Sequence, residues 1–183
     1  MKNVFILCLS AILIACGSKK ELSKNRDIEV IEPCSGPEYV SDSNHFRASA
    51  MGISNSQEIA KQKAMTSARA KLASSIQTKV KTVTDNYLSS YELNQSEEAK
   101  GRFQSITREI SNQTLNGIKT ICQKLMQSPD GKYKSYITIE IGSDDIIKEL
   151  NNKISNDDKL RIDYEYEKFK KVFEEEMKNI SNE

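Results

Sequence analysis

The 183-residue chain has no tryptophan, one histidine and seven glycines. Nucleophilic catalysis needs a base beside a serine or cysteine, and His45 is the only histidine that could serve. It stands alone at the start of a predicted strand, where we expect an ordinary surface residue. The glycines are scattered, so no phosphate-binding loop occurs, and histidines and cysteines do not cluster at metal-ligand spacing. We therefore expect no catalytic residue, no metal and no cofactor, and hence no enzyme.

An excess of charge of one sign is also missing. The chain carries 27 basic and 26 acidic residues, whereas binding to nucleic acid needs a clustered basic excess. Hydrophobic residues make up 37% of the chain and aromatic residues 7%, which permits only a modest core. These proportions argue against a nucleic-acid partner and against a large multi-layer enzyme.

Neighbouring carboxylates are the remaining candidates for acid and base chemistry. They are the pairs Asp144-Asp145 and Asp157-Asp158 and the run Glu174-Glu175-Glu176. We expect the pairs at helix caps and first turns, where negative charge is favoured, and the run on a solvated helix face. A paired-carboxylate hydrolase is therefore the least favoured function.

The one long apolar stretch, residues 4–15, is too short to cross a membrane. Its 12 residues form about 18 Å of helix, against about 30 Å of hydrocarbon. Lys2 precedes the stretch and the polar sequence GSKKELSKN follows it, which is typical of an export signal. Its end, Leu13-Ile14-Ala15-Cys16, resembles the lipobox of bacterial lipoproteins. We expect residues 1–15 to be a removed signal peptide and Cys16 to be the lipidated first residue of the mature chain.

The lipobox resemblance implies a location as well as a modification. It implies fatty acyl chains such as palmitate on the Cys16 sulfur and amine, and several chains together anchor a protein stably. Residue 17 is glycine rather than aspartate, so the common inner-membrane retention signal is missing. We expect a lipid anchor in the outer membrane of a Gram-negative cell envelope, on either face. The alternative is a plain secretory signal in which Cys16 is incidental.

Residues 16–44 are predicted to be the lipidated cysteine followed by a tether. They mix charges with Pro33, Gly36 and Pro37 and show no sustained helical or alternating period. Compact structure is therefore expected to begin at residue 45, with the alternative that the short apolar stretch Ile28-Glu29-Val30-Ile31 docks as an edge strand.

A strand and a long helix are predicted next. Residues 45–53 alternate small and apolar side chains as a short strand, and Asn55 with Glu58 resembles a capping box that begins a helix. The helix carries an apolar ladder at steps of three and four: Ala60, Ala64, Ala68, Leu72, Ile76, Val80, Val83, Tyr87 and Tyr91. The opposite side carries Lys61, Lys71, Lys79 and Lys81, which we expect in water.

A helical insert, a hairpin and two further helices complete the expected fold. A second apolar stripe predicts the insert around residues 95–113. Residues 118–126 and 133–141 are expected to pair across the turn Ser128-Pro129-Asp130-Gly131. One side of the second strand should face the core and the other side water. Residues 143–183 then show two amphipathic helical stripes.

A family resemblance rests on three of these features. The strand ending at Gly52, the helix EIAKQKAMTSARAKLASSIQTKVKTV and the hairpin segment DGKYKSYITIEI together resemble the Lpp-twenty family of twenty-kilodalton outer-membrane lipoproteins. The resemblance covers residues 45–142 and implies an α+β domain, with a long amphipathic helix packed on an antiparallel sheet of three or more strands. The helical insert and the C-terminal helical extension 143–183 lie outside the pattern. The family has no agreed catalytic residues, so the resemblance implies none here.

Two cysteines remain once Cys8, in the signal peptide, and Cys16 are set aside. Cys34 lies in the predicted tether and Cys122 in the first strand of the hairpin. Exported chains meet oxidising conditions, so the two are a natural disulfide pair that would tie the tether to the sheet. The alternative is two unpaired thiols.

The C-terminal helices could serve either the fold or a partner. Residues 143–183 contain 12 acidic and 8 basic residues, a net charge of −4, while residues 56–92 contain 6 basic and 3 acidic, a net charge of +3. Opposite charges could dock the extension on its own domain or help two subunits associate. The aromatic stripe therefore packs either on the chain's own core or against a partner.

Three functions of different classes follow from the sequence. We expect a non-enzymatic envelope lipoprotein, a structural or interaction module anchored to the membrane through Cys16, which associates with itself or with another envelope protein. The alternatives are a binding module for a small ligand, peptide or glycan, and a cryptic hydrolase. A deep pocket would favour the former alternative and a buried carboxylate pair the latter.

Overall fold

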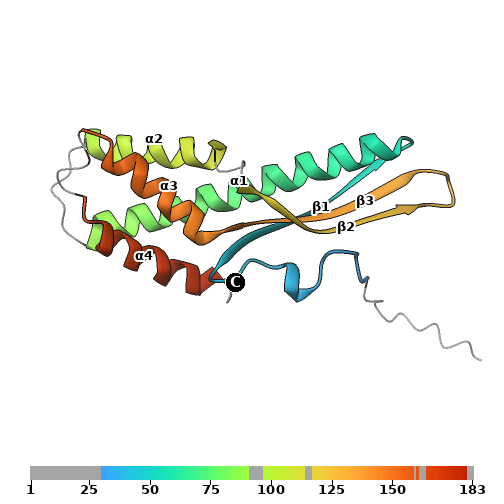
Figure 1. The fold of residues 1–183 in the computed structure, drawn as a ribbon, viewed down its shortest axis with the longest axis horizontal. Helices are drawn as coiled ribbons and strands as arrows, with labels where there is room; N and C mark the ends of the chain where they lie inside the picture. Colours follow the sequence, from blue (N-terminus) through green and yellow to red (C-terminus); the bar gives the residue numbers. More distant parts are fainter. Residues whose placement is uncertain (1–29, 91–96, 114–116, 159, 161–163, 181–183) are drawn as a thin grey trace, which may run out of the picture. The chain divides into compact units, whose positions relative to one another are not determined.

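The computed structural model describes residues 30–90, 97–113, 117–158, 160 and 164–180 (Figure 1). The predicted signal peptide 1–15 and Cys16 lie outside the described residues. Residues from Ile31 onward belong to one compact unit. In the part of the chain that the structure describes, no helix combines the length and the apolar character that a bilayer crossing requires.

The unit is an α+β fold, as the sequence predicts. Its elements are the 3-10 helix η1 (Pro37–Tyr39), strands β1 (His45–Ser54), β2 (Lys119–Gln127) and β3 (Tyr133–Gly142), and helices α1 (Gln57–Ser90), α2 (Glu97–Gln113), α3 (Ser143–Ser155) and α4 (Tyr166–Asn179). The sheet is antiparallel with the order β1-β3-β2, so the last strand in the chain is the central one. The first half of α1 lies along the sheet, and the second half extends past it into a bundle with α2, α3 and α4 (Figure 1).

Helix α1 approaches the sheet closely because small residues meet at the contact. Ala60, Ala64 and Ala68 are fully buried, and Gly52 of β1 faces the first two. A Cβ atom on Gly52 would lie 2.5 Å from the backbone nitrogen of Ala64. The predicted ladder is the buried face of α1 as far as Tyr87, and its last member, Tyr91, lies outside the described residues.

The start of α1 differs from the sequence prediction by one residue. The helix begins at Gln57, and the carbonyl oxygen of Ser56 accepts a hydrogen bond from the Ala60 N–H (3.0 Å). The Ser56 hydroxyl also accepts from the Ile59 N–H, at 3.5 Å. Ser56 therefore caps the helix in place of Asn55.

Tyr87 joins the end of α1 to three other segments. Its ring centroid lies 6.4 Å from that of Phe103 in α2, 5.3 Å from that of Phe169 in α4 and 6.3 Å from that of Tyr164. Its hydroxyl accepts a hydrogen bond from the backbone N–H of Glu165 (3.0 Å). Because edge-to-face rings and a partly buried hydrogen bond meet at one residue, Tyr87 fixes the bundle end of the unit.

The C-terminal helix packs on its own core rather than presenting its aromatic stripe outward. Phe169, Phe173 and Met177 of α4 are buried in the main hydrophobic cluster. Of the two alternatives that the sequence left open for this stripe, packing on the chain's own core is the one that the structure contains.

Lys79 and Glu176 were both expected on solvated helix faces, and both expectations are wrong. Lys79, expected in water, is only 9% exposed, and its Nζ lies 3.8 Å from Oε2 of Glu176. Glu176 also accepts a hydrogen bond from the Asn86 side chain (2.7 Å). Since α2 and α4 both pack on α1, part of the predicted wet face becomes internal. The two glutamates before Glu176 are exposed as expected.

The predicted hairpin is present and its bounds agree within one residue. Gly131 adopts the left-handed region (φ 83°), and its N–H donates to the Ser128 carbonyl oxygen (2.9 Å). A bulge that the sequence did not predict shifts the register of β2 against β3 between Thr120 and Cys122.

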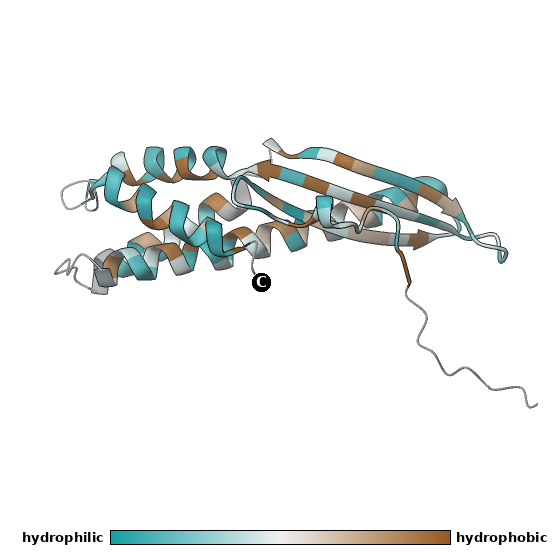
Figure 2. Cartoon of the chain, turned by 90° about the horizontal axis from the view of Figure 1, so that it is seen from below, coloured by the Kyte–Doolittle hydropathy of each residue, from teal (hydrophilic) through white to brown (hydrophobic). Residues whose placement is uncertain are grey.

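The described residues from Ile31 onward belong to one compact unit, which includes residues 31–44 of the predicted tether and the described part of 143–183. Residues 31–44 cross the outer face of the sheet, the face that points away from α1 (Figure 2). They belong to the fold because the contacts described next hold them there.

Candidate functional site

Cys34 sits over one row of residues that runs across all three strands. Ser49 of β1 pairs with Thr138 of β3, and Thr138 pairs with Cys122 of β2. Cys34 and Cys122 form a disulfide, with an S–S distance of 2.07 Å and Cα atoms 5.7 Å apart. We call these four residues the Cys34 row.

Hydrogen bonds complete the Cys34 row. The hydroxyls of Thr138 and Ser49 lie 2.7 and 3.0 Å from the Cys34 carbonyl oxygen, and 2.8 Å from each other. With one proton on each hydroxyl, two of these three hydrogen bonds form at a time. Cys34 holds a left-handed backbone (φ 60°), a conformation that a non-glycine residue keeps when its surroundings fix it.

The Cys34 row also changes the exposure of the central strand. Thr138 lies on the side of β3 that was expected to face water, yet it is fully buried beneath residues 31–44. The opposite side of β3 is buried against α1 as predicted, with Ile137, Ile139 and Ile141 in the core. The middle of β3 is therefore covered on both faces.

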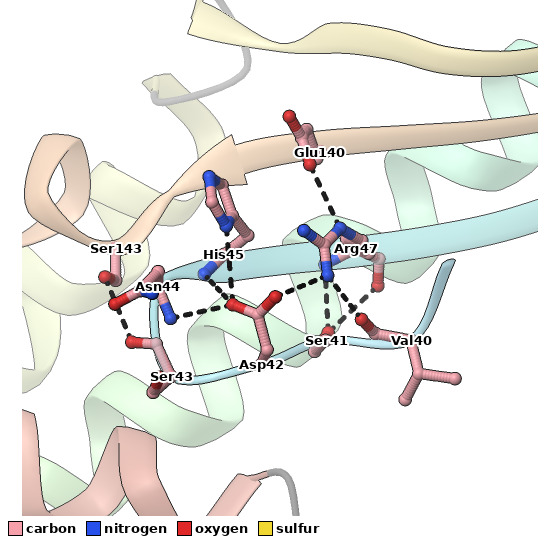
Figure 3. Close-up of polar contacts among 9 residues, drawn as sticks. All are labelled: Val40, Ser41, Asp42, Ser43, Asn44, His45, Arg47, Glu140 and Ser143. Carbon is pink, nitrogen blue, oxygen red and sulfur yellow. Dashed lines mark hydrogen bonds and ion pairs between the residues drawn. The ribbon is translucent and has the colours of Figure 1, made fainter. Parts of the chain in front are cut away.

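A second set of contacts fixes the chain just before β1 (Figure 3). The guanidinium of Arg47 donates to Oδ2 of Asp42 (2.6 Å), to Oε2 of Glu140 (3.0 Å) and to the Val40 carbonyl oxygen (2.8 Å). Oδ1 of Asp42 accepts from the backbone N–H of His45 (2.9 Å) and lies 3.3 Å from the ring Nδ1 of the same residue. We call Asp42, His45, Arg47 and Glu140 the Arg47 cluster.

Burial and ion pairing have opposite effects on the charged groups of the Arg47 cluster. Burial alone would raise the pKa of the Asp42 carboxyl, but hydrogen bonds from the Asn44 N–H and from Arg47, with the charge of Arg47, lower it below its ordinary value of 3.8. Burial likewise opposes the charge of Arg47, and its hydrogen bonds to Asp42 and Glu140 outweigh that effect and raise its pKa. One cation held by hydrogen bonds between two carboxylates is an arrangement that stabilises the fold.

The Asp42 carboxyl gives the stability of the fold a predictable dependence on pH. Because its pKa is lower in the folded state, its contribution is fully present above the unfolded pKa of 3.8 and is lost as the pH falls through the lower folded value. When the pH is lowered from about 6 to about 3, the urea midpoint of Asp42→Asn should fall less steeply than that of the unsubstituted protein. The side chain is 41% exposed, so we expect a difference below about 1 kcal/mol.

Asp85→Asn is the matched control for this measurement. Asp85 pairs with Lys81 one turn away on an exposed part of α1. That variant should keep the steepness of the unsubstituted protein, and equal flattening by both variants would contradict the role given to Asp42.

The remaining carboxylate pairs are structural as well. Asp144 and Asp145 lie in the first turn of α3, as predicted. Asp157 lies beyond the end of α3 instead of in the first turn of another helix, and it is buried. Its Oδ2 accepts from Arg102 of α2 (2.7 Å) and its Oδ1 from the Leu160 N–H (3.3 Å).

A groove of about 570 Å³ lies between α2 and α3. Charged and amide side chains line it, and two ion pairs cross it, Lys153 with Glu109 (2.6 Å) and Arg102 with Asp157 (2.7 Å). A ligand pocket is normally mostly apolar with a few polar groups that converge, and this groove is neither.

The structure brings some of the candidate residues predicted from the sequence close together, but it does not bring all of them into one site. Cys34 and Cys122 lie in the Cys34 row, and His45 is partly exposed beside Asp42. Among the described residues, no three histidine, cysteine, aspartate or glutamate side chains group as metal ligands. Sequence reasoning missed the Arg47 cluster; its one visible signal was that Arg47 and Glu140 each fall on an outward-facing strand position.

Comparison with protein-family models, with curated proteins and with solved structures gives no match. The resemblance to the Lpp-twenty family therefore stays a prediction from the sequence.

Proposed function

We infer that this protein is a non-enzymatic envelope lipoprotein, an interaction module carried on the outer membrane by an acylated Cys16. The observation that carries the inference is how residues 31–44 are held. The Cys34 row fixes them covalently, and the Arg47 cluster fixes them again before β1. A chain that leaves a lipid anchor and is then fastened twice to its domain suits a protein that must stay attached while its partners pull on it.

The site chemistry supports an interaction role over catalysis. Ion pairs hold the charges of the Arg47 cluster, and two further ion pairs cross the groove between α2 and α3. A hydrolase needs a carboxylate pair whose pKa values are pushed apart in a cleft, and the clusters above are ion pairs between opposite charges. A binding module for a small ligand, peptide or glycan remains the second candidate, and the groove is where it would bind.

The anchor is tested by substitution of the two cysteines of the amino terminus. Cys16→Ala should abolish labelling of the chain by a clickable fatty-acid probe and should block normal processing, because the thiol that accepts the lipid is gone. Cys8→Ala is the matched control, since Cys8 lies in the same apolar run without a small residue before it. Persistent labelling of Cys16→Ala, or loss of labelling in Cys8→Ala, would contradict the proposal.

A further inference from the structure

The two edges of the sheet differ in how far the rest of the chain makes hydrogen bonds to their outward backbone groups. Side chains occupy three of the outward backbone groups of β1. The Arg47 N–H donates to Ser41 Oγ (2.9 Å), while the Ser49 carbonyl oxygen accepts from Lys71 Nζ (3.1 Å) and the Ile53 carbonyl oxygen from Lys63 Nζ (3.3 Å). A further strand that paired with β1 at these residues would have to break these contacts.

The outer edge of β2 is open. In an antiparallel pair, residues alternate between bonding the neighbouring strand and pointing away from it. The hydrogen bond from Ser128 N–H to Lys132 O places the even-numbered residues of β2 beyond the bulge toward β3. The N–H and C=O groups of Gln123, Leu125 and Gln127 therefore point outward. Within the part of the chain that the structure describes, no hydrogen bond from another segment covers that edge.

Beyond the bulge, both faces of β2 are uncovered as well. Helix α1 packs on β1 and β3, and all five residues from Gln123 to Gln127 are exposed. Leu125 is 37% and Met126 49% exposed, and these two point to opposite faces of the strand. A long edge strand with apolar side chains and a free backbone row readily accepts another strand.

The charges beside the outer edge of β2 indicate what kind of strand could pair with it. Lys124 of β2 and Lys134 of β3 lie on the same outer face, on neighbouring strands, with Met126 beside them. A second copy of β2 would bring its own lysines to this edge, whereas glutamate or aspartate side chains on an incoming strand would meet them favourably. The lysines therefore select against self-pairing and in favour of an acidic partner.

We propose that the outer edge of β2 receives, as a fourth strand, an extended segment of a partner protein in which acidic and apolar side chains alternate. The acidic side chains lie on the face of Lys124, and the apolar ones lie on the face of Leu125. The five residues from Gln123 to Gln127, beyond the bulge, offer the regular stretch for pairing. The proposal rests on the interaction role inferred above and specifies its partner, but it does not depend on the lipid anchor.

The test uses the full chain in detergent and a synthetic eight-residue peptide that alternates glutamate and valine. We expect saturable binding by fluorescence polarisation, with a dissociation constant below about 1 mM. Amide hydrogen exchange should slow at Gln123 and Leu125 when the peptide is present. A lysine-valine peptide of the same length should bind at least about tenfold more weakly.

Gln123→Pro removes an outward N–H without removing a bond to β3, and proline is tolerated on edge strands. It should weaken binding of the glutamate-valine peptide at least about tenfold, whereas Gln123→Thr, the matched control, should bind like the unsubstituted chain. If Gln123→Pro does not fold by circular dichroism, peptides methylated on alternate backbone nitrogens decide the question with the protein unchanged. Methylation of the peptide nitrogens whose N–H groups point toward β2 should abolish binding, and methylation of the nitrogens at the opposite edge of the peptide should not.

Three results would overturn the proposal. They are no binding at about 1 mM peptide, equal binding by Gln123→Pro and Gln123→Thr, and amide hydrogen exchange that slows at residues outside β2 but not within it. Concentration-dependent self-association that Gln123→Pro abolishes would also overturn it, because the occupant would then be a second copy. None of these results bears on fatty-acid labelling of Cys16, so failure here and failure of the proposed anchor are distinguishable.

Discussion

Gly52→Ala is expected to destabilise the protein by about 3 kcal/mol, although it adds a single methyl group. The new Cβ would fall inside the contact distance of two backbone atoms, the Ala60 carbonyl oxygen and the Ala64 nitrogen. Backbone in the middle of a helix cannot rotate away as a side chain can. Helix α1 must therefore lift from β1, and the buried alanine contacts must loosen. Urea unfolding followed by circular dichroism measures the loss as a lower midpoint.

Gly101→Ala provides the opposite outcome as a control. Gly101 lies inside α2, it is exposed, and a Cβ there would meet nothing within 4 Å. Alanine should stabilise that helix by about 0.5 to 1 kcal/mol, because it has the higher helix propensity. If Gly52→Ala were as stable as the unsubstituted chain, the close approach of α1 to β1 would be wrong.

Removal of the disulfide is the second large expected effect. The pair closes a loop with a sequence separation of 88 residues. In the chain-entropy account, such a loop corresponds to about 4 to 5 kcal/mol, and measured losses are often smaller. The double variant Cys34→Ala with Cys122→Ala should lower the urea midpoint, and dithiothreitol should lower that of the unsubstituted protein to the same level. In the double variant, the reductant should change nothing.

Mass spectrometry of the unreduced, alkylated protein tests the bond itself. Neither Cys34 nor Cys122 should carry the alkyl label before reduction, and both should carry it afterwards. Full labelling of both before reduction would show that the bridge is absent from the protein in solution.

Local patterns predicted the elements of the fold well. The ladder on α1 and the hairpin around Gly131 depend on spacing and turn chemistry within about one helix or one hairpin, whereas the α+β class was implied by the family resemblance. Such patterns are visible without knowing what packs against the segment. The buried stripe of α4 was also visible, but the sequence did not decide whether it faces its own core or a partner.

The errors about burial and side-chain contacts arise where distant segments meet, whereas the helix cap at Ser56 and the bulge in β2 are small local errors. Lys79 was placed in water because its own helix gave no sign that α4 would bring Glu176 beside it. Thr138 was placed on a wet face because nothing local shows that residues 31–44 lie over it. The suspected pairing of Cys34 with Cys122 did contain that information, since a disulfide to the hairpin requires the segment to cross the sheet. The Arg47 cluster depends on the register of β1 against β3, which the sequence does not reveal.

The position of Cys34 has a mechanical consequence. Tension applied at Ile31 divides at Cys34, where one path runs through the sulfur atoms into β2 and the other along the backbone into β1. These two strands flank β3 on either side. The load is thus shared by both outer strands instead of peeling one strand from the sheet. Forced extraction must then break hydrogen bonds on both sides of β3, whereas a terminal strand pulled alone would break one ladder only.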